Sequence, residues 1–183
     1  MHLHEYGDGW TGYCTGRYLM LAVSDDLESS LKTVEIGRGC RHVVPAVGIH
    51  PWNVDPSQGT EAVRALEDIV ASHGIAFLGE VGLDRAFHPE TFDAQLRVFE
   101  GLLKVASEYD LGVSVHAAGA WRDVLELLRR YRIAVAVFHW YTGPLELISE
   151  IVDEGYFIGI NPAISIQRKH EEVLRRAPLE SVV

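Results

Sequence analysis

Long apolar runs, a basic surplus and cysteine pairs at metal-binding spacing are all missing from this chain of 183 residues. No run approaches the roughly 20 apolar residues of a membrane-spanning helix, so the sequence predicts no membrane segment. The N-terminus lacks the basic and apolar stretches of a signal peptide, and we expect a cytoplasmic protein. A formal net charge of −10 argues against sequence-blind nucleic-acid binding through a broad basic face. It does not argue against a small pocket in which metal ions grip a phosphate.

Cysteine is also scarce. Cys14 and Cys40 are isolated from each other in the sequence, and we expect both to be reduced rather than disulfide-bonded. Linkers, charge blocks and low-complexity tracts are missing too, which predicts a single domain over residues 1–183. A hydrophobic content of 48% is sufficient for one well-buried core.

Short β-branched runs alternate with helical patterns along the chain. Asp25 is expected to cap the helix after the first strand, with Glu28 as its capping-box partner. Strict alternation predicts βαβ units and a parallel sheet, either a TIM-type (β/α)8 barrel or a doubly wound open sheet. No glycine-rich phosphate loop follows the first strand, which favours the barrel. Strands are expected at 18–23, 43–49, 75–78, 113–115, 134–138 and 156–160, with a further strand beginning at 181–183.

Polar residues gather where the expected strands end. These residues are Ser24, His50, Glu80, His116, His139 and Asn161. Carboxyl ends of parallel strands share one edge, where barrels place their active sites. A lone histidine there is more often a hydrogen-bonded core residue. Two histidines and an acid at equivalent positions favour a divalent metal instead, because imidazole and carboxylate are suitable ligands.

Neighbouring residues are candidates for binding a substrate. Arg85 could reach a phosphate, whereas Trp52 and Trp140 could stack on a base or line the cleft, as could Tyr141. Packing is the commoner role for such aromatic residues. Asp84 is expected mainly as a loop cap. The remaining histidines of loops and polar helix faces are expected to be solvated: His42, His73, His88 and His170.

Several short motifs occur in order from residue 2 to residue 183. They are His2-x-His4, GIHPW (48–52), GEVGLD (79–84), VHA (115–117), FHWYTG (138–143) and IGINPAI (158–164). Each is weak alone, but together the set resembles the TatD-related metal-dependent hydrolases. These are amidohydrolase-like barrels whose best-known members are deoxyribonucleases.

The resemblance implies a ligand set and an activity. His2 and His4 would bind one metal, Glu80 would bridge two metals, and His116 and His139 would bind the second. His50 would contact a substrate phosphate or support the ligands, which makes Glu80 and His50 the candidate catalytic residues. The cofactors would be one or two divalent ions, namely Zn, Mn or Mg. The activity would be phosphodiester hydrolysis, with DNA ends or a small phosphodiester as substrate.

Two departures from the family pattern leave alternatives open. If Leu3 is the leucine that follows the family's second histidine, His2 is the second ligand; the direct alignment uses both His2 and His4. The family's aspartate on an eighth strand is absent up to Val183. We therefore expect either residues beyond both ends or a barrel that is incomplete at its first and eighth strands. An unpaired strand edge would make a homodimer feasible.

Two other functions stay in competition with a nuclease. The same metals could hydrolyse an amide or a lactone, because fold does not fix the substrate. The chain could also be a non-catalytic barrel remnant, since one expected ligand is missing.

Overall fold

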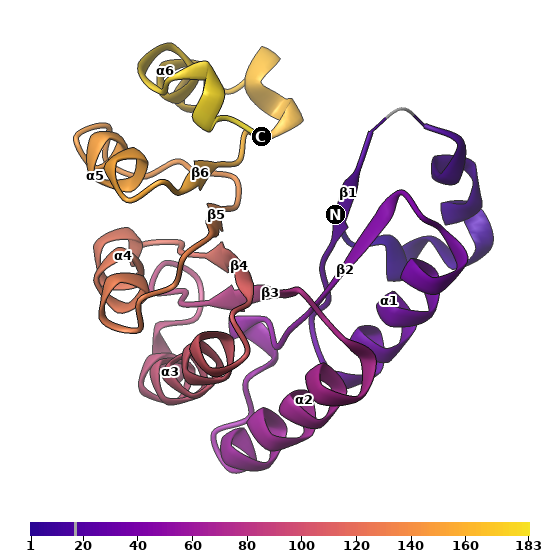
Figure 1. Cartoon of the computed structure of the whole chain (residues 1–183). Helices are drawn as coiled ribbons and strands as arrows, with labels where there is room; N and C mark the ends of the chain where they lie inside the picture. Colours follow the sequence, from indigo (N-terminus) through magenta and orange to yellow (C-terminus); the bar gives the residue numbers. More distant parts are fainter. Residues whose placement is uncertain (17) are drawn as a thin grey trace.

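Six parallel strands form one curled sheet, and helices cover its outer face (Figure 1). The computed structural model describes residues 1–16 and 18–183. The strands are β1 (Met20–Ala22), β2 (Val43–Val47), β3 (Phe77–Gly82), β4 (Gly112–His116), β5 (Ala136–Phe138) and β6 (Phe157–Ile158). The α-helices are α1 (Leu27–Gly39), α2 (Gly59–His73), α3 (Phe92–Glu108), α4 (Trp121–Arg130), α5 (Leu147–Asp153) and α6 (Arg168–Arg176). Short 3-10 segments are η1 (Leu3–Thr15), η2 (Pro51–Asn53), η3 (Pro89–Thr91), η4 (Pro162–Ser165) and η5 (Leu179–Ser181).

The strands lie side by side in chain order, from β1 through β6, and every pair is parallel. A doubly wound sheet would reverse its strand order part-way, so that alternative was wrong. Continuous curling in one direction gives a half-barrel, which confirms the prediction of an incomplete TIM-type barrel (Figure 1). The expected strands were correct in number and order, although several are shorter than predicted.

The core lies between the sheet and the helical layer. Helix α3 carries an apolar stripe that includes Phe99, Leu102 and Leu103, each at most 1% exposed. On the strand side, Val113 and Val115 of β4 are fully buried. Burying each of these larger side chains contributes about 1.5–3 kcal/mol. This layer therefore fixes the helices and, through them, the loops that follow each strand.

Both ends of the chain lie beside the edges of the sheet. The N-terminal amino group of Met1 donates a hydrogen bond to the carbonyl oxygen of Leu21 over 2.9 Å. The amide of Val23 donates one to the carbonyl oxygen of Met1 over 3.1 Å, so the chain start lies beside β1. At the other edge Val182 forms an isolated parallel bridge with Ile158, whereas Ser181 belongs to η5, so only this one bridge stands where a strand was predicted at 181–183. In Figure 1 the two termini face each other across the open side of the half-barrel. Among the described helices, none is long and apolar enough to cross a bilayer.

The cap of α1 differs from the prediction. Asp26, not Asp25, is the N-cap, and its carboxylate accepts a hydrogen bond from the Ser29 amide at 2.8 Å. Ser29 completes the capping box by accepting from the Asp26 amide, so Glu28 has no part in it. The predicted register was wrong by one residue, because two successive aspartates precede the helix and only the second adjoins it. The carboxylate of Asp25 is thereby available elsewhere.

The prediction of reduced cysteines was also wrong. Cys14 and Cys40 form a disulfide, with their Cα atoms 5.4 Å apart. Segment η1 runs back along α1 and brings Cys14 to the residue that ends that helix. Isolation along the sequence therefore said nothing about distance in space. The bond ties η1, which begins next to the polar edge of the sheet, to the helical layer.

Candidate metal centre

Glu80 is the centre of the polar cluster at the carboxyl edge of the sheet. It lies on β3, in the middle of the sheet, and is 3% exposed. Its Oε1 accepts a hydrogen bond from Nδ1 of His116, at the end of β4, over 3.0 Å. Its Oε2 lies 3.8 Å from Nε2 of His139, which follows β5. The three residues predicted from neighbouring strand ends are therefore brought together around one carboxylate.

His50 joins the same cluster from the end of β2. Its Nε2 lies 3.2 Å from Nδ1 of His116 and 3.7 Å from Oε1 of Glu80. The donor atoms of His50, Glu80 and His116 all lie within 4.8 Å of one another, close enough to share a metal ion. The sequence predicted that His50 contacts substrate or supports the ligands, and its imidazole lies beside both Glu80 and His116. His139 lies on the opposite carboxylate oxygen.

The negative charge of the Glu80 carboxylate is stabilised by the imidazoles around it. Burial raises the pKa of Glu80, but hydrogen bonds with His116, His2 and His50 outweigh burial and hold that pKa far below its ordinary value. Burial lowers the pKa of His139 to about 4, so its imidazole is neutral near pH 7. An ionised carboxylate beside a neutral imidazole is the protonation pattern that metal ligands require.

Asp84 supports His116 from behind. It is fully buried, and its Oδ2 accepts from Nε2 of His116 at 2.9 Å and from the Trp52 indole at 2.6 Å. Its Oδ1 accepts from the amides of Ala86 and Phe87. A carboxylate on the far nitrogen fixes the orientation of a ligating imidazole. The predicted role of Asp84 as a loop cap accounts for the hydrogen bonds of Oδ1 with the two amides, but not for the contact of Oδ2 with His116. The position of Asp84 in GEVGLD, the motif that also contains Glu80, was the signal for this contact.

Two glycines allow the strands to approach at this edge. A Cβ at Gly48 would lie 2.7 Å from the backbone of Gly79, next to Glu80. A Cβ at Gly82 would overlap the carbonyl oxygen of His116, and Gly82 has a φ of +145° that side chains rarely adopt. These two positions let β2, β3 and β4 bring their ligands within reach of each other.

A second group of donor atoms lies beside the first. His2, His4 and Asp25 also have donor atoms within 4.8 Å of one another. Burial lowers the pKa of His4, whereas the carboxylates of Asp25 and Glu80 raise the pKa of His2 to about 9. Asp25 was missed as a site residue, although it directly follows the predicted strand end at Ser24. His2 connects the groups, because its Nε2 lies 3.3 Å from Oε2 of Glu80.

Both groups open into a cavity of about 600 Å³ at the carboxyl edge. Trp52 and Trp140 line it with about half of their surface exposed, and the Trp140 ring stacks on His139 with centroids 4.9 Å apart. Among the described lining residues the acids are Glu5, Asp25 and Glu80, and no lysine or arginine occurs. An anionic substrate would therefore depend on bound cations for its positive counter-charge.

The other predicted substrate contacts lie elsewhere. Arg85 is exposed, pairs with Asp123 at 3.3 Å and lies over the ring of Phe92. Tyr141 is fully buried and donates to the carbonyl oxygen of Pro144, so it cannot stack on a base. A phosphate contact by Arg85 stays a prediction.

The prediction that His170 is solvated was wrong. It is 2% exposed and lines the cavity from α6, and burial lowers its pKa. The sequence missed this because α6 is polar almost throughout, so its buried face could not be identified by hydrophobic periodicity.

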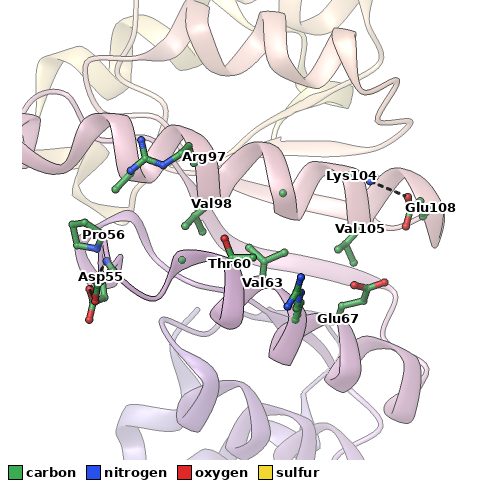
Figure 2. Close-up of a pocket in the computed structure, with 15 residues that line it drawn as sticks. Asp55, Pro56, Thr60, Val63, Glu67, Arg97, Val98, Lys104, Val105 and Glu108 are labelled. Atoms are coloured by element: carbon green, nitrogen blue, oxygen red, sulfur yellow. Dashed lines mark hydrogen bonds and ion pairs between the residues drawn. The ribbon is translucent and has the colours of Figure 1, made fainter.

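Another hollow lies far from this chemistry, in the helical layer. A groove with a volume of about 310 Å³ lies between α2 and α3, and Val63 and Val98 line it among charged side chains (Figure 2). Its charged groups include an ion pair of Lys104 with Glu108. None of the donor groups around Glu80 or Asp25 belongs to it, so the cavity at the carboxyl edge is the candidate site.

Parallel strands that bring histidines and a buried carboxylate to one cavity define a half-barrel of the (β/α)8 type with a candidate metal site. Comparison with known families makes this specific. Residues 14–183 match the family described as TatD related DNase, and the chain belongs to that family. The matched residues exclude His2 and His4, so their ligand roles depend on geometry.

Individual relatives agree with this placement. The 3′-5′ ssDNA/RNA exonuclease TatD of Citrobacter rodentium is 28% identical over 93% of the chain and 66% of its own length. The deoxyribonuclease Tat-D of Schizosaccharomyces pombe is 26% identical over 90% of the chain and 57% of its own length. The crystal structure of YJJV, a TatD homolog from Escherichia coli, superposes with a TM-score of 0.81 at 23% identity. It covers 90% of this chain and 65% of that one, so the chain spans about two thirds or less of these relatives.

Proposed function

We propose that the chain is a metal-dependent hydrolase that cleaves phosphodiester bonds at nucleic-acid ends. The observation that carries the proposal is Glu80, a buried carboxylate surrounded by His50, His116 and His139. Relatives named as exonuclease and deoxyribonuclease support the substrate class. The substrate, the activity and the ligand roles are inferences for this chain.

The donor set fits a divalent cation. It offers imidazole nitrogens, of which that of His139 is neutral near pH 7, and an ionised carboxylate, which suits zinc or manganese better than magnesium. Bound cations would neutralise the phosphate and lower the pKa of a water molecule. Glu80, His50, His116 and His139 would hold them, and His2 and His4 would be further ligands beside Oε2 of Glu80, the oxygen that also faces His139.

Other side chains would orient the site and the substrate. Asp84 would keep His116 with its Nδ1 toward Glu80. Trp52 and Trp140 flank the cavity with exposed rings on which a terminal base could stack, a contact that tolerates any sequence. The chain thus supplies ligands and base contacts, and metal supplies the charge that the lining lacks.

An end-labelled single-stranded DNA assay tests this function. Wild type with Mn²⁺ or Mg²⁺ should shorten the DNA, whereas Glu80→Gln should reduce the rate at least about 100-fold, because it removes a ligand charge. Glu61→Gln on the exposed face of α2 is the matched control and should keep wild-type activity. Equal cleavage by wild type and Glu80→Gln would contradict the assignment.

A second function keeps one specific observation in its favour. The described lining lacks lysine and arginine, which suits a neutral amide or lactone better than a polyanion. The same enzyme preparations should therefore be assayed on model lactones and amides. Metal-dependent cleavage of these with untouched DNA would select the alternative, and a folded, metal-loaded but inactive chain would indicate a non-catalytic remnant.

Location and assembly belong to the same proposal. We retain the cytoplasm as the expected location, although the disulfide of η1 removes the argument from reduced cysteines. The half-barrel is not closed between β1 and β6, and the terminal residues pair with only part of these two edge strands, which supports a homodimer. Light scattering of the purified chain measures this, and a monomer at all concentrations would exclude it.

A further inference from the structure

His170 is a buried polar side chain of the cavity whose hydrogen bonding is incomplete. It lies on α6, is 2% exposed and lines the cavity. Its Nδ1 is buried and has no hydrogen-bond partner in the described part of the chain. Buried polar atoms without partners are rare in folded proteins and require an explanation. A ligand that enters the cavity would supply the missing partner.

The imidazole of His170 is uncharged near pH 7. Burial lowers the pKa of His170 below its ordinary value, which already lies under 7. A neutral imidazole carries one donor nitrogen and one acceptor nitrogen. The side chain is therefore suited to a neutral polar ligand rather than to a phosphate.

Gln167 offers a second uncharged group next to His170. It directly precedes α6, but its side chain does not cap that helix, and the exposed amide lines the cavity. The backbone carbonyl oxygen of Gln167 accepts a hydrogen bond from the His170 amide over 3.1 Å, which fixes the two residues relative to each other. A side-chain amide presents a donor and an acceptor side by side.

Trp140 supplies a flat surface to the same cavity. Its ring is 51% exposed and stacks on His139, with the ring planes 22° apart. Gly159 lets the end of β6 pass close to this turn, because a Cβ at Gly159 would lie 3.3 Å from the backbone nitrogen of Trp140. The connection from β6 to α6 therefore begins beside Trp140.

The cavity is divided by charge along the sequence. Its carboxylates all come from residues 5–80 among the described lining residues. Residues 140–170 contribute only uncharged groups to the described lining, namely Trp140, Thr142, Asn161, Gln167 and His170. An exposed aromatic ring with neutral donors and acceptors is the environment that binds a nucleobase, which stacks by its face and hydrogen-bonds by its edge.

We propose that Trp140, Gln167 and His170 form a nucleobase subsite that prefers adenine. The base stacks on Trp140, and the amide of Gln167 pairs with the amino group and ring nitrogen of the adenine edge, as amides do in base recognition. His170 adds a further hydrogen bond. The inference rests on the proposed function and deepens it, because stacking accepts any base whereas these edge contacts select one.

Titration with free nucleosides, followed by tryptophan fluorescence, tests the subsite without a cleavage assay. Deoxyadenosine and deoxyinosine have rings of the same size, but an amino group on the first is replaced by a carbonyl oxygen on the second. Wild type should bind deoxyadenosine about 5- to 150-fold more tightly, the discrimination expected of a bidentate amide–adenine pair. Gln167→Ala, at an exposed position, should bind the two nucleosides equally.

Variants of His170 test the hydrogen bond separately. His170→Leu fills the buried space without a donor or acceptor and should weaken deoxyadenosine binding about 2- to 10-fold. His170→Gln retains both kinds of group and should recover part of the loss, which a purely structural role would not predict. Lys169→Ala, an exposed neighbour outside the described lining, is the matched control and should bind as wild type.

The outcomes separate this subsite from the nuclease, because free nucleosides carry no phosphate. Equal binding of the two nucleosides by wild type, an undiminished preference in Gln167→Ala, or an unchanged affinity in His170→Leu would each overturn the proposal. If circular dichroism shows that His170→Leu does not fold, the Gln167→Ala result decides. Cleavage of DNA without a nucleoside preference would contradict only the subsite, whereas a preference with untouched DNA would support it and contradict the nuclease.

Discussion

Asp84 illustrates how one residue sets the chemistry of another. Its two oxygens accept from His116, Trp52 and two backbone amides, so every hydrogen-bond position of the carboxylate is engaged. The ring of His116 is thereby held with one nitrogen on Asp84 and the other on Glu80. Changing Asp84 would alter the cluster without removing a ligand.

The first prediction concerns this support. Asp84→Asn should weaken metal binding about 10- to 100-fold, because supporting partners of ligating histidines typically contribute that much. Calorimetry with Zn²⁺ measures the affinity. Asp123→Asn, whose carboxylate pairs with Arg85 on the surface, is the control and should bind as wild type. An unchanged affinity in Asp84→Asn would show that His116 needs no such support.

Residue-level prediction from the sequence was correct where the backbone dictates position. His50, Glu80, His116 and His139 meet because parallel strands place their carboxyl ends at one edge. The contacts of Asp25 with His2 and of Asp84 with His116 were missed because both aspartates lie in loops, where no periodicity reports the direction of a side chain.

At the scale of elements, the β3–β4 pair depends on a glycine. Gly82 pairs with His116 in the sheet, and its backbone lies against the His116 carbonyl. Any side chain at Gly82 would separate these strands at the point where two ligands approach each other.

The second prediction follows from this contact. Gly82→Ala should destabilise the fold by at least about 3 kcal/mol, because it combines a backbone clash with an unfavourable φ. Urea denaturation gives the free energy of unfolding. Gly12→Ala, with open space around its added Cβ, should change it by less than about 0.5 kcal/mol. A small effect at Gly82 would mean that β3 and β4 can shift apart.

A third prediction concerns the disulfide between η1 and α1. Cys14→Ser should lower the free energy of unfolding by about 3 kcal/mol, since the bond closes a loop with a sequence separation of 26. Denaturation with and without reductant measures the loss, and Ser57→Ala in an exposed turn serves as the comparison. Two reactive thiols in the native, oxidised protein would show that the bond does not form.

At the scale of the whole molecule, the strand order was predictable and the closure of the barrel was not. Alternating strand and helix patterns determine parallel neighbours through short right-handed connections. How far six strands curl depends on twist and packing summed over the whole sheet, which no local pattern reports. The Cys14–Cys40 bond escaped prediction for a similar reason, because it depends on the path of η1 across the fold.

The fourth prediction links metal to global stability. Ions that bind only the folded chain stabilise it by about 2.7 kcal/mol at a concentration 100 times the Kd. For a protein of this size that raises the Tm by about 5–10 °C. Thermal melts with Zn²⁺ and with chelator give the shift, which should shrink in Glu80→Gln and persist in Glu61→Gln. Melts that coincide with and without Zn²⁺ would argue against binding.

The contact between the Trp52 indole and Asp84 also provides a built-in optical reporter. Emission from an indole responds to the charge near its N–H group, and here that group is joined through one carboxylate to the ring of His116. Loading of the cavity should consequently change the tryptophan spectrum of the unmodified protein. The difference between wild type and Trp52→Phe would isolate that signal, so ligands could be screened without a label.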